Sequence, residues 1–174
     1  VFGQRVPLIS DEYALMNSFD FQKWMKFDNE IITNVGVYGK MINSLTDENV
    51  RITDRIGLPR KKLKGFQYNA IGPVDAGDYV GGNYATSINL TSTLPMIMPS
   101  LESVDFKYFL DIGNVWGVDY SSSIDDSNKI RSSTGLGVEW FTPIGPMTFS
   151  LAQDITKAST DKTEGFQFNL GTTF

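Results

Sequence analysis

The sequence has no cysteine and no histidine among its 174 residues. Without cysteine the chain cannot form disulfides or use thiol chemistry, and it gives no indication of a redox compartment. Without histidine it lacks the commonest metal ligand and general base. We also find no Ser-His-Asp set, no metal-ligand cluster and no phosphate-binding loop. We therefore expect no catalytic residue, no metal, no cofactor and no enzymatic activity.

Long hydrophobic runs are also missing. No run of about 18 consecutive apolar residues is present, so the sequence contains no candidate transmembrane helix. A transmembrane β-barrel would escape that test, because only alternate residues of its strands face lipid. The net charge of −5 gives no reason to expect a nucleic-acid partner. No signal peptide is visible at Val1, and the chain opens in strand-like sequence, so we expect a fragment of a longer protein.

Apolar and polar residues alternate along much of the chain, most clearly between Val104 and Trp116. From Val104 to Ile112 the residues of one parity are large and apolar, whereas the other parity of the segment includes Lys107, Asp111 and Gly113. This period of two predicts β-strands. About eight such segments are present, joined alternately by short turns and longer polar loops: 2–9, 13–27, 30–45, 83–94, 104–116, 129–141, 147–152 and 165–174.

The polar face of these predicted strands is rich in Gly, Ser and Asn with isolated charges. A lipid-facing apolar side opposite a polar interior is the pattern of an outer-membrane β-barrel. Aromatic residues near strand ends suit interfacial belts: Trp116, Trp140, Phe141 and Phe174. The alternative is a soluble β-sandwich, but its solvated face would more often carry Lys and Glu. We expect an all-β, antiparallel barrel.

The stretch from Arg51 to Gly82 has no clear strand period and holds six basic residues. About thirty residues of irregular chain is too long for an ordinary connection, so we expect a functional loop or a linker. Its aromatic and aliphatic content argues against disorder. We interpret it as an ordered loop folded against something acidic.

Six motifs, taken in order, resemble the C-terminal half of the barrel of the Omp85 superfamily. They are LKGF at Leu63–Phe66, IGP at Ile71–Pro73, GGN at Gly81–Asn83, FLDIGNVW at Phe109–Trp116, IRSSTGLGVEWFTPIGP at Ile130–Pro146 and FQFNLGTTF at Phe166–Phe174. Each motif alone is weak, but their order and spacing together are specific. The resemblance runs from about Gly3 to the last residue.

The resemblance implies a sixteen-stranded transmembrane barrel in the outer membrane of a Gram-negative bacterium, preceded by periplasmic POTRA domains. Residues 1–174 would supply about eight strands, half of that barrel, and the loop 46–80 would fold into its lumen. An alternative to a single chain is a split barrel that a second polypeptide completes.

The resemblance also implies site residues. The family's loop motif is VRGF, and here it is Leu63, Lys64, Gly65 and Phe66, so Lys64 stands where the family has Arg. Its implied partner is the inward-facing Asp111, and a second acid of some members falls near Thr91 and is absent here. A lysine keeps the charge but loses bidentate geometry. The resemblance further implies a seam at the last strand, formed by Phe166, Phe168, Leu170, Gly171 and Phe174.

Each of these residues also has a plainer interpretation. Lys64 could be a solvated loop lysine, and Asp111 could merely hydrate a lumen. Arg131 and Glu139 could be ordinary lumen or rim charges, and we expect the pair Asp125–Asp126 to face water. A terminal aromatic is common to most bacterial outer-membrane barrels.

The function that the resemblance implies is that of an assembly factor that folds and inserts β-barrel proteins into the outer membrane. Its implied partners are outer-membrane lipids and lipopolysaccharide, unfolded barrel clients and accessory lipoproteins. The alternatives are a protein-translocation pore of the same superfamily, of the TamA or two-partner-secretion type, and a passive porin. The LKGF, IGP and GGN motifs argue against a simple porin.

Overall fold

The computed structural model of the protein describes residues 1–5, 13–27, 30–97, 100, 103–124, 126–143 and 145–171. Its elements are β1 (Phe2–Arg5), β2 (Ala14–Lys26), β3 (Ile32–Ser44), η2 (Ile52–Asp54), η3 (Arg60–Lys62), β4 (Val74–Asp75), β5 (Asp78–Tyr79), β6 (Tyr84–Thr93), β7 (Val104–Trp116), η4 (Ser122–Ile124), β8 (Arg131–Thr142), β9 (Gly145–Thr156) and β10 (Phe166–Leu170). In the part of the chain that the structure describes, no helix is long and apolar enough to cross a membrane.

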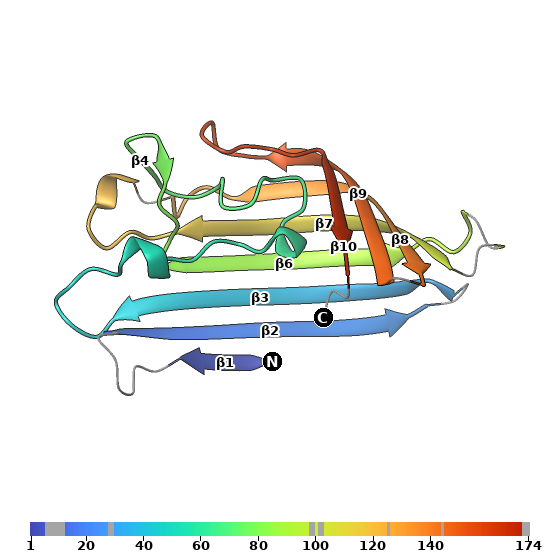
Figure 1. Cartoon of the computed structure of the whole chain (residues 1–174), viewed down its shortest axis with the longest axis horizontal. Coiled ribbons are helices and arrows are strands. Elements are labelled where there is room, and N and C mark those ends of the chain that lie inside the picture. The colour runs from blue at the N-terminus through green and yellow to red at the C-terminus, as the bar shows by residue number, and fades with distance from the viewer. Residues whose placement is uncertain are drawn as a thin grey trace.

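Eight strands form one antiparallel sheet in the order β1-β2-β3-β6-β7-β8-β9-β10 (Figure 1). Each strand pairs with its neighbours in the chain, apart from the small β4–β5 hairpin, which forms its own two-stranded sheet. The sheet is open, with β1 and β10 at its edges. This architecture confirms the predicted all-β, antiparallel fold with eight strands.

Two details of the sequence-based prediction were wrong. The segment 154–164 was expected to be a loop, yet β9 continues to Thr156. The β8–β9 register shifts at Ser132/Ser133, so Ile155 has no partner in the ladder and the alternation is lost there. The stretch 51–82, expected to be irregular, contains the short β4–β5 hairpin. The predicted last strand, 165–174, is described over Phe166–Leu170, and Phe174 lies outside the described residues.

Strand register places the two parities on opposite faces of the sheet. One row pairs Tyr108 with Leu136, Leu136 with Leu151 and Leu151 with Phe166 across four strands. A second row, three residues further along these strands, pairs Asn89 with Asp111, Asp111 with Ser133 and Ser133 with Asp154. The first row belongs to the apolar face, where Leu151 is 62% exposed. The second belongs to the polar face.

The long segment between β3 and β6 lies over the polar face, visible as the teal and green trace in front of the strands in Figure 1. Its apolar residues form the core of the chain together with three residues of the sheet. The cluster comprises Val50, Ile56, Leu58, Leu63, Phe66 and Ile71 of the loop with Ile42, Ala85 and Val115 of the strands. The only large apolar core among the described residues is therefore the loop–sheet interface, and the outer apolar face is left for another environment.

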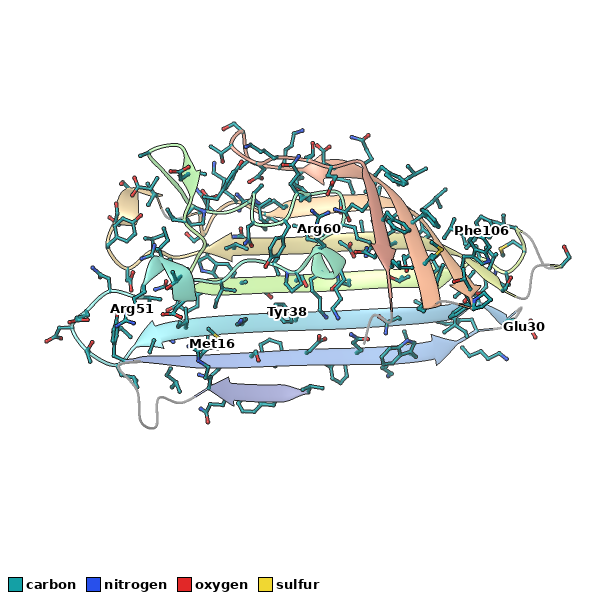
Figure 2. The ribbon with its side chains drawn as sticks, in the orientation of Figure 1. Met16, Glu30, Tyr38, Arg51, Arg60 and Phe106 are labelled. Atoms are coloured by element: carbon teal, nitrogen blue, oxygen red, sulfur yellow. The ribbon has the colours of Figure 1, made fainter. Side chains whose placement is uncertain are left out.

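The connections alternate in length between the two ends of the sheet, as the sequence predicts. Figure 2 places Glu30 and Phe106 at one end and Arg51 at the other. In chain order, each connection at the first end (27–31, 94–103 and 143–144) is shorter than the one that follows it at the second end (45–83, 117–130 and 157–165). The loop that fills the polar face starts from the second end.

Because one face of the sheet is apolar and the other is polar, a charged substitution should destabilise the protein on the first face and not on the second. Leu151→Arg places a charge on the apolar face, and in a bilayer it should lower the free energy of unfolding by about 2–4 kcal/mol. Thr148→Arg is the matched control on the same strand, because Thr148 faces the polar side opposite Glu139 and should be nearly neutral. Urea unfolding of the full-length protein in lipid vesicles measures both. Equal losses would contradict the assignment of the faces.

Candidate functional site

The LKGF turn sits at the centre of the loop–sheet interface. Leu63 and Phe66 are each 2% exposed and belong to the core, so the two residues between them are held against the strands. Gly65 has φ of +87°, and a Cβ added there would lie 3.0 Å from the Cβ of Ala152. A left-handed backbone with so close an approach favours glycine. The turn therefore presents Lys64 toward β7 in one defined geometry.

Lys64 forms an ion pair with Asp111, whose side chain is fully buried. The distance from Lys64 Nζ to Asp111 Oδ2 is 2.8 Å, and the Lys64 backbone N–H donates to the same oxygen at 3.0 Å. Asn89 Nδ2 donates to the other carboxylate oxygen at 2.8 Å. A buried carboxylate is stable only with such partners. The contact inferred from the resemblance is present, and its functional role remains a prediction.

A second ion pair, which the sequence analysis missed, anchors the preceding turn. Lys62 Nζ lies 2.7 Å from Asp20 Oδ2 on β2, and the Lys62 side chain is 6% exposed. The ammonium also lies 5.2 Å from the centre of the Tyr38 ring on β3. Asp20 is the one acidic residue in β2, and it lies on the same face of the strand as Ser18 and Gln22. This position on the polar face was the signal in the sequence that could have identified it as a partner for a loop lysine. We call these two pairs, Lys62–Asp20 and Lys64–Asp111, the loop anchor.

Three further strands donate hydrogen bonds to the backbone of the loop. Asn89 of β6 donates to the Lys62 carbonyl at 2.8 Å. Ser133 of β8 donates to the Lys64 carbonyl. Gln167 of β10 donates through Nε2 to the Phe66 carbonyl at 3.0 Å. Side chains of β2, β6, β7, β8 and β10 therefore form ion pairs or hydrogen bonds with the loop. The edge strand β10 is thus attached to the loop directly.

Arg131, for which an ordinary lumen or rim charge was the plainer interpretation, is the largest fully buried side chain among the described residues. It is 0% exposed and grips Asp161 with two hydrogen bonds, Nε to Oδ2 at 2.9 Å and Nη2 to Oδ1 at 2.8 Å. It also donates to Asp126 and Asn114. Asp126 was expected to face water, so that expectation was wrong. This arginine ties the β7–β8 and β9–β10 loops together.

Further ion pairs and hydrogen bonds connect the loops at the same end of the molecule. Arg55 pairs with Asp119 at 3.0 Å, and Tyr79 donates to the Thr160 carbonyl. Burial, and then the negative charge of Asp161, raises the pKa of Tyr79. A hydrogen bond to Asp75, then burial, raises the pKa of Tyr120. Both hydroxyls therefore stay protonated over the physiological range.

Three of the predicted seam residues, Phe166, Phe168 and Leu170, lie on β10 and face outward, at 54%, 45% and 57% exposed. Among the described residues, β10 pairs with β9 over five residues. Gly171 follows with φ of +119°, and its backbone N–H donates to the Pro146 carbonyl at 3.0 Å. The structure brings Leu63, Lys64, Gly65, Phe66 and Asp111 together, and β10 reaches them only through Gln167. Among the described residues no group of three or more acidic side chains could hold a metal ion.

An open antiparallel sheet with one apolar outer face and one polar face fits half of a transmembrane β-barrel. The chain belongs to the Omp85 superfamily, whose domain model matches residues 6–174. It is accordingly an outer-membrane protein.

Individual relatives agree with this membership. The chain is 26% identical to the outer membrane protein assembly factor BamA of Neorickettsia risticii over 99% of its own length and 24% of the relative's. It is 29% identical to BamA of Neisseria meningitidis serogroup B, over 64% of its length and 17% of that protein. The crystal structure of BamA from Haemophilus ducreyi lacking POTRA domains 1–3 matches with a TM-score of 0.83 at 24% identity, over 91% of this chain and 35% of that one. The chain thus spans about a quarter or less of the two curated relatives.

The loop anchor predicts unequal costs for its two halves. Lys64→Ala leaves the Asp111 carboxylate buried without its cation and should cost about 3–5 kcal/mol of unfolding free energy. Lys62→Met should cost less, because Asp20 is 30% exposed and can be rehydrated. In a double-mutant cycle, adding Asp111→Asn to Lys64→Ala should recover part of the loss. Strict additivity in urea unfolding of the full-length protein would contradict a direct interaction.

Arg131→Lys should loosen the long-loop end while leaving the sheet intact. Lysine cannot reproduce the two parallel hydrogen bonds to Asp161. Limited proteolysis should therefore cut within 157–165 several-fold faster in the variant. Arg60→Lys is the control, because the Arg60–Glu164 pair is 44% and 32% exposed and contributes little. Equal cleavage of the two variants would contradict the role given to Arg131.

Proposed function

We propose that residues 1–174 form the C-terminal half of a sixteen-stranded barrel, with the loop 46–80 inside its lumen, and that the whole protein folds and inserts other barrel proteins into the outer membrane. The observation that carries the proposal is the weakly paired edge strand β10, which is attached to the lumen loop. Superfamily membership and the names of the relatives support the same activity.

The physical problem that such a protein solves is the unpaired strand edge. Backbone N–H and C=O groups without partners cost several kcal/mol in lipid, so an incomplete sheet cannot stay there. A client strand that pairs with an existing edge avoids this cost by β-augmentation. Among the described residues, β10 pairs with β9 over five residues, against ten in the β7–β8 ladder and eleven in the β8–β9 ladder. A short seam of this kind is easy to open.

The loop anchor has a matching role in this proposal. A barrel that opens at its seam needs the rest of its wall to keep its shape. Lys64–Asp111 holds the loop to β7, Lys62–Asp20 holds it to β2, and Gln167 links it to β10. The loop then braces the wall from inside while β10 exchanges partners. The proposed partners are outer-membrane lipids and lipopolysaccharide, unfolded clients and accessory lipoproteins.

The test is the folding of an unfolded barrel protein into vesicles that contain the full-length protein. Lys64→Ala should slow client folding and lower the temperature at which the barrel loses its heat-modifiable mobility on gels. Lys157→Ala is the control, since its pair with Asp154 is 45% and 22% exposed and should matter little. Unchanged folding and mobility in Lys64→Ala would contradict the bracing role.

Conductance separates the remaining alternatives. Full-length protein in a planar bilayer should give at most small, transient currents, because the loop fills the lumen side of this half. A large steady conductance together with no client folding would contradict the assembly function and favour a translocation pore or a porin.

A further inference from the structure

The edge strand β10 has one edge in the sheet and one open edge. Among the described residues it pairs with β9 and with no other strand. Ala152 N–H donates to the Gly165 carbonyl and Gly171 N–H donates to the Pro146 carbonyl, so the odd-numbered residues direct their backbone groups toward β9. Because backbone groups alternate in direction along a strand, the even-numbered residues within 166–170 direct theirs toward the open edge.

The same even-numbered series continues before the start of β10, and there the loop occupies it. Glu164 N–H donates to the Gly65 carbonyl at 2.9 Å, and Lys162 N–H donates to the Ala70 carbonyl at 3.0 Å. The Lys162 carbonyl accepts a hydrogen bond from Gln67 N–H at 3.0 Å. Each of these N–H groups can be donated only once. The loop therefore uses the backbone groups that another strand would need in order to pair beyond the start of β10.

This contact has the pattern of a short strand pair, and the loop is held firmly in it. Phe66 and Thr163 form an antiparallel bridge, and the chain bends at Gly165 between that bridge and β10. The Phe66 side chain belongs to the buried core, and the Phe66 carbonyl accepts a hydrogen bond from Gln167 Nε2 on β10. Covering an edge with a loop is one way in which proteins prevent a strand from pairing with another chain.

From these hydrogen bonds we propose that the loop segment 65–70 is a pairing stop, which limits how far a client strand can pair along the open edge. This inference rests on the proposed function, in which an extended strand of an unfolded barrel protein pairs with β10. The client strand pairs with β10 from Phe166 onward and does not extend past Gly165, where the loop begins to occupy the edge. The pairing stop thereby fixes the register of the client strand. Register matters because a slip of one residue would turn its apolar side chains from the lipid to the lumen.

Disulfide cross-linking of the full-length protein to a client tests the pairing stop. The probe is a small eight-stranded barrel protein, added unfolded to vesicles, whose terminal strands carry single cysteines and which is oxidised early in folding. The chain has no cysteine of its own, so single cysteines can replace, one at a time, Lys162, Glu164, Phe166, Phe168 and Leu170. A disulfide needs Cα atoms about 4.4–6.8 Å apart, so its formation reports strand pairing.

We expect disulfides at the three positions on β10 and several-fold fewer at the two positions before it. Equal capture at all five positions would overturn the pairing stop and leave the assembly function standing. Capture at none of them would contradict the assembly function, and the pairing stop with it.

Gln67→Pro is the variant that should move this boundary. Proline has no backbone N–H, so the variant loses the hydrogen bond to the Lys162 carbonyl. Gln67→Ala is the matched control, because alanine keeps that N–H and the Gln67 side chain is exposed. Capture at the two positions before β10 should rise several-fold in Gln67→Pro and stay at the wild-type level in Gln67→Ala. The same boundary in both variants would overturn the proposal.

Gln167→Leu keeps the test decisive if the proline variant does not fold. It removes the side-chain hydrogen bond from β10 to the Phe66 carbonyl and leaves the backbone of the loop unchanged. Asn169→Leu is the control, because Asn169 lies two residues further along the same face of β10 and is exposed. Capture at position 164 should rise several-fold in Gln167→Leu and not in Asn169→Leu. Equal capture in these two variants, with the barrel folded by gel mobility, would overturn the pairing stop.

Discussion

The buried carboxylate of Asp111 is the constraint on which the inner organisation of this chain depends. A fully buried charge must have a cation and hydrogen-bond donors within reach, because its desolvation would otherwise be prohibitive. Those partners come from Lys64 on the loop and from Asn89 on β6. The loop must therefore return to the polar face, and Gly65 must adopt the left-handed conformation that lets it fit there.

As a result, the two faces of the sheet differ in what packs against them. The polar face, with the loop on it, contains the packed core, the two ion pairs and the links to five strands. Large apolar side chains on the other face remain exposed among the described residues, and a bilayer covers them in a member of this family. The edge strand β10 contributes no residue to this core, and its described ladder with β9 is five residues long.

The alternation of apolar and polar residues along the sequence was sufficient to predict most of the strands. Alternation over Val104–Trp116 predicts β7 with its observed bounds, because a period of two is set by neighbouring residues alone. It also places Asp111 on the polar face. The pattern fails at Ile155, where the β8–β9 register shifts, since a bulge disturbs the very period on which the prediction rests. The β4–β5 hairpin is too short, at two residues a strand, to give any period.

What the sequence by itself determined is the class of fold, the two faces of the sheet and, through the family resemblance, the pair Lys64–Asp111. Only the tertiary structure decided the partners of Lys62 and Arg131. Lys62 meets Asp20 across 42 residues of sequence, and Arg131 meets Asp161 across 30. No local rule gives the direction of a lysine in an irregular loop, nor which of several acids will come close to a given arginine. Those choices follow from how the loop lies on the sheet, which is set by the packing of Leu63 and Phe66.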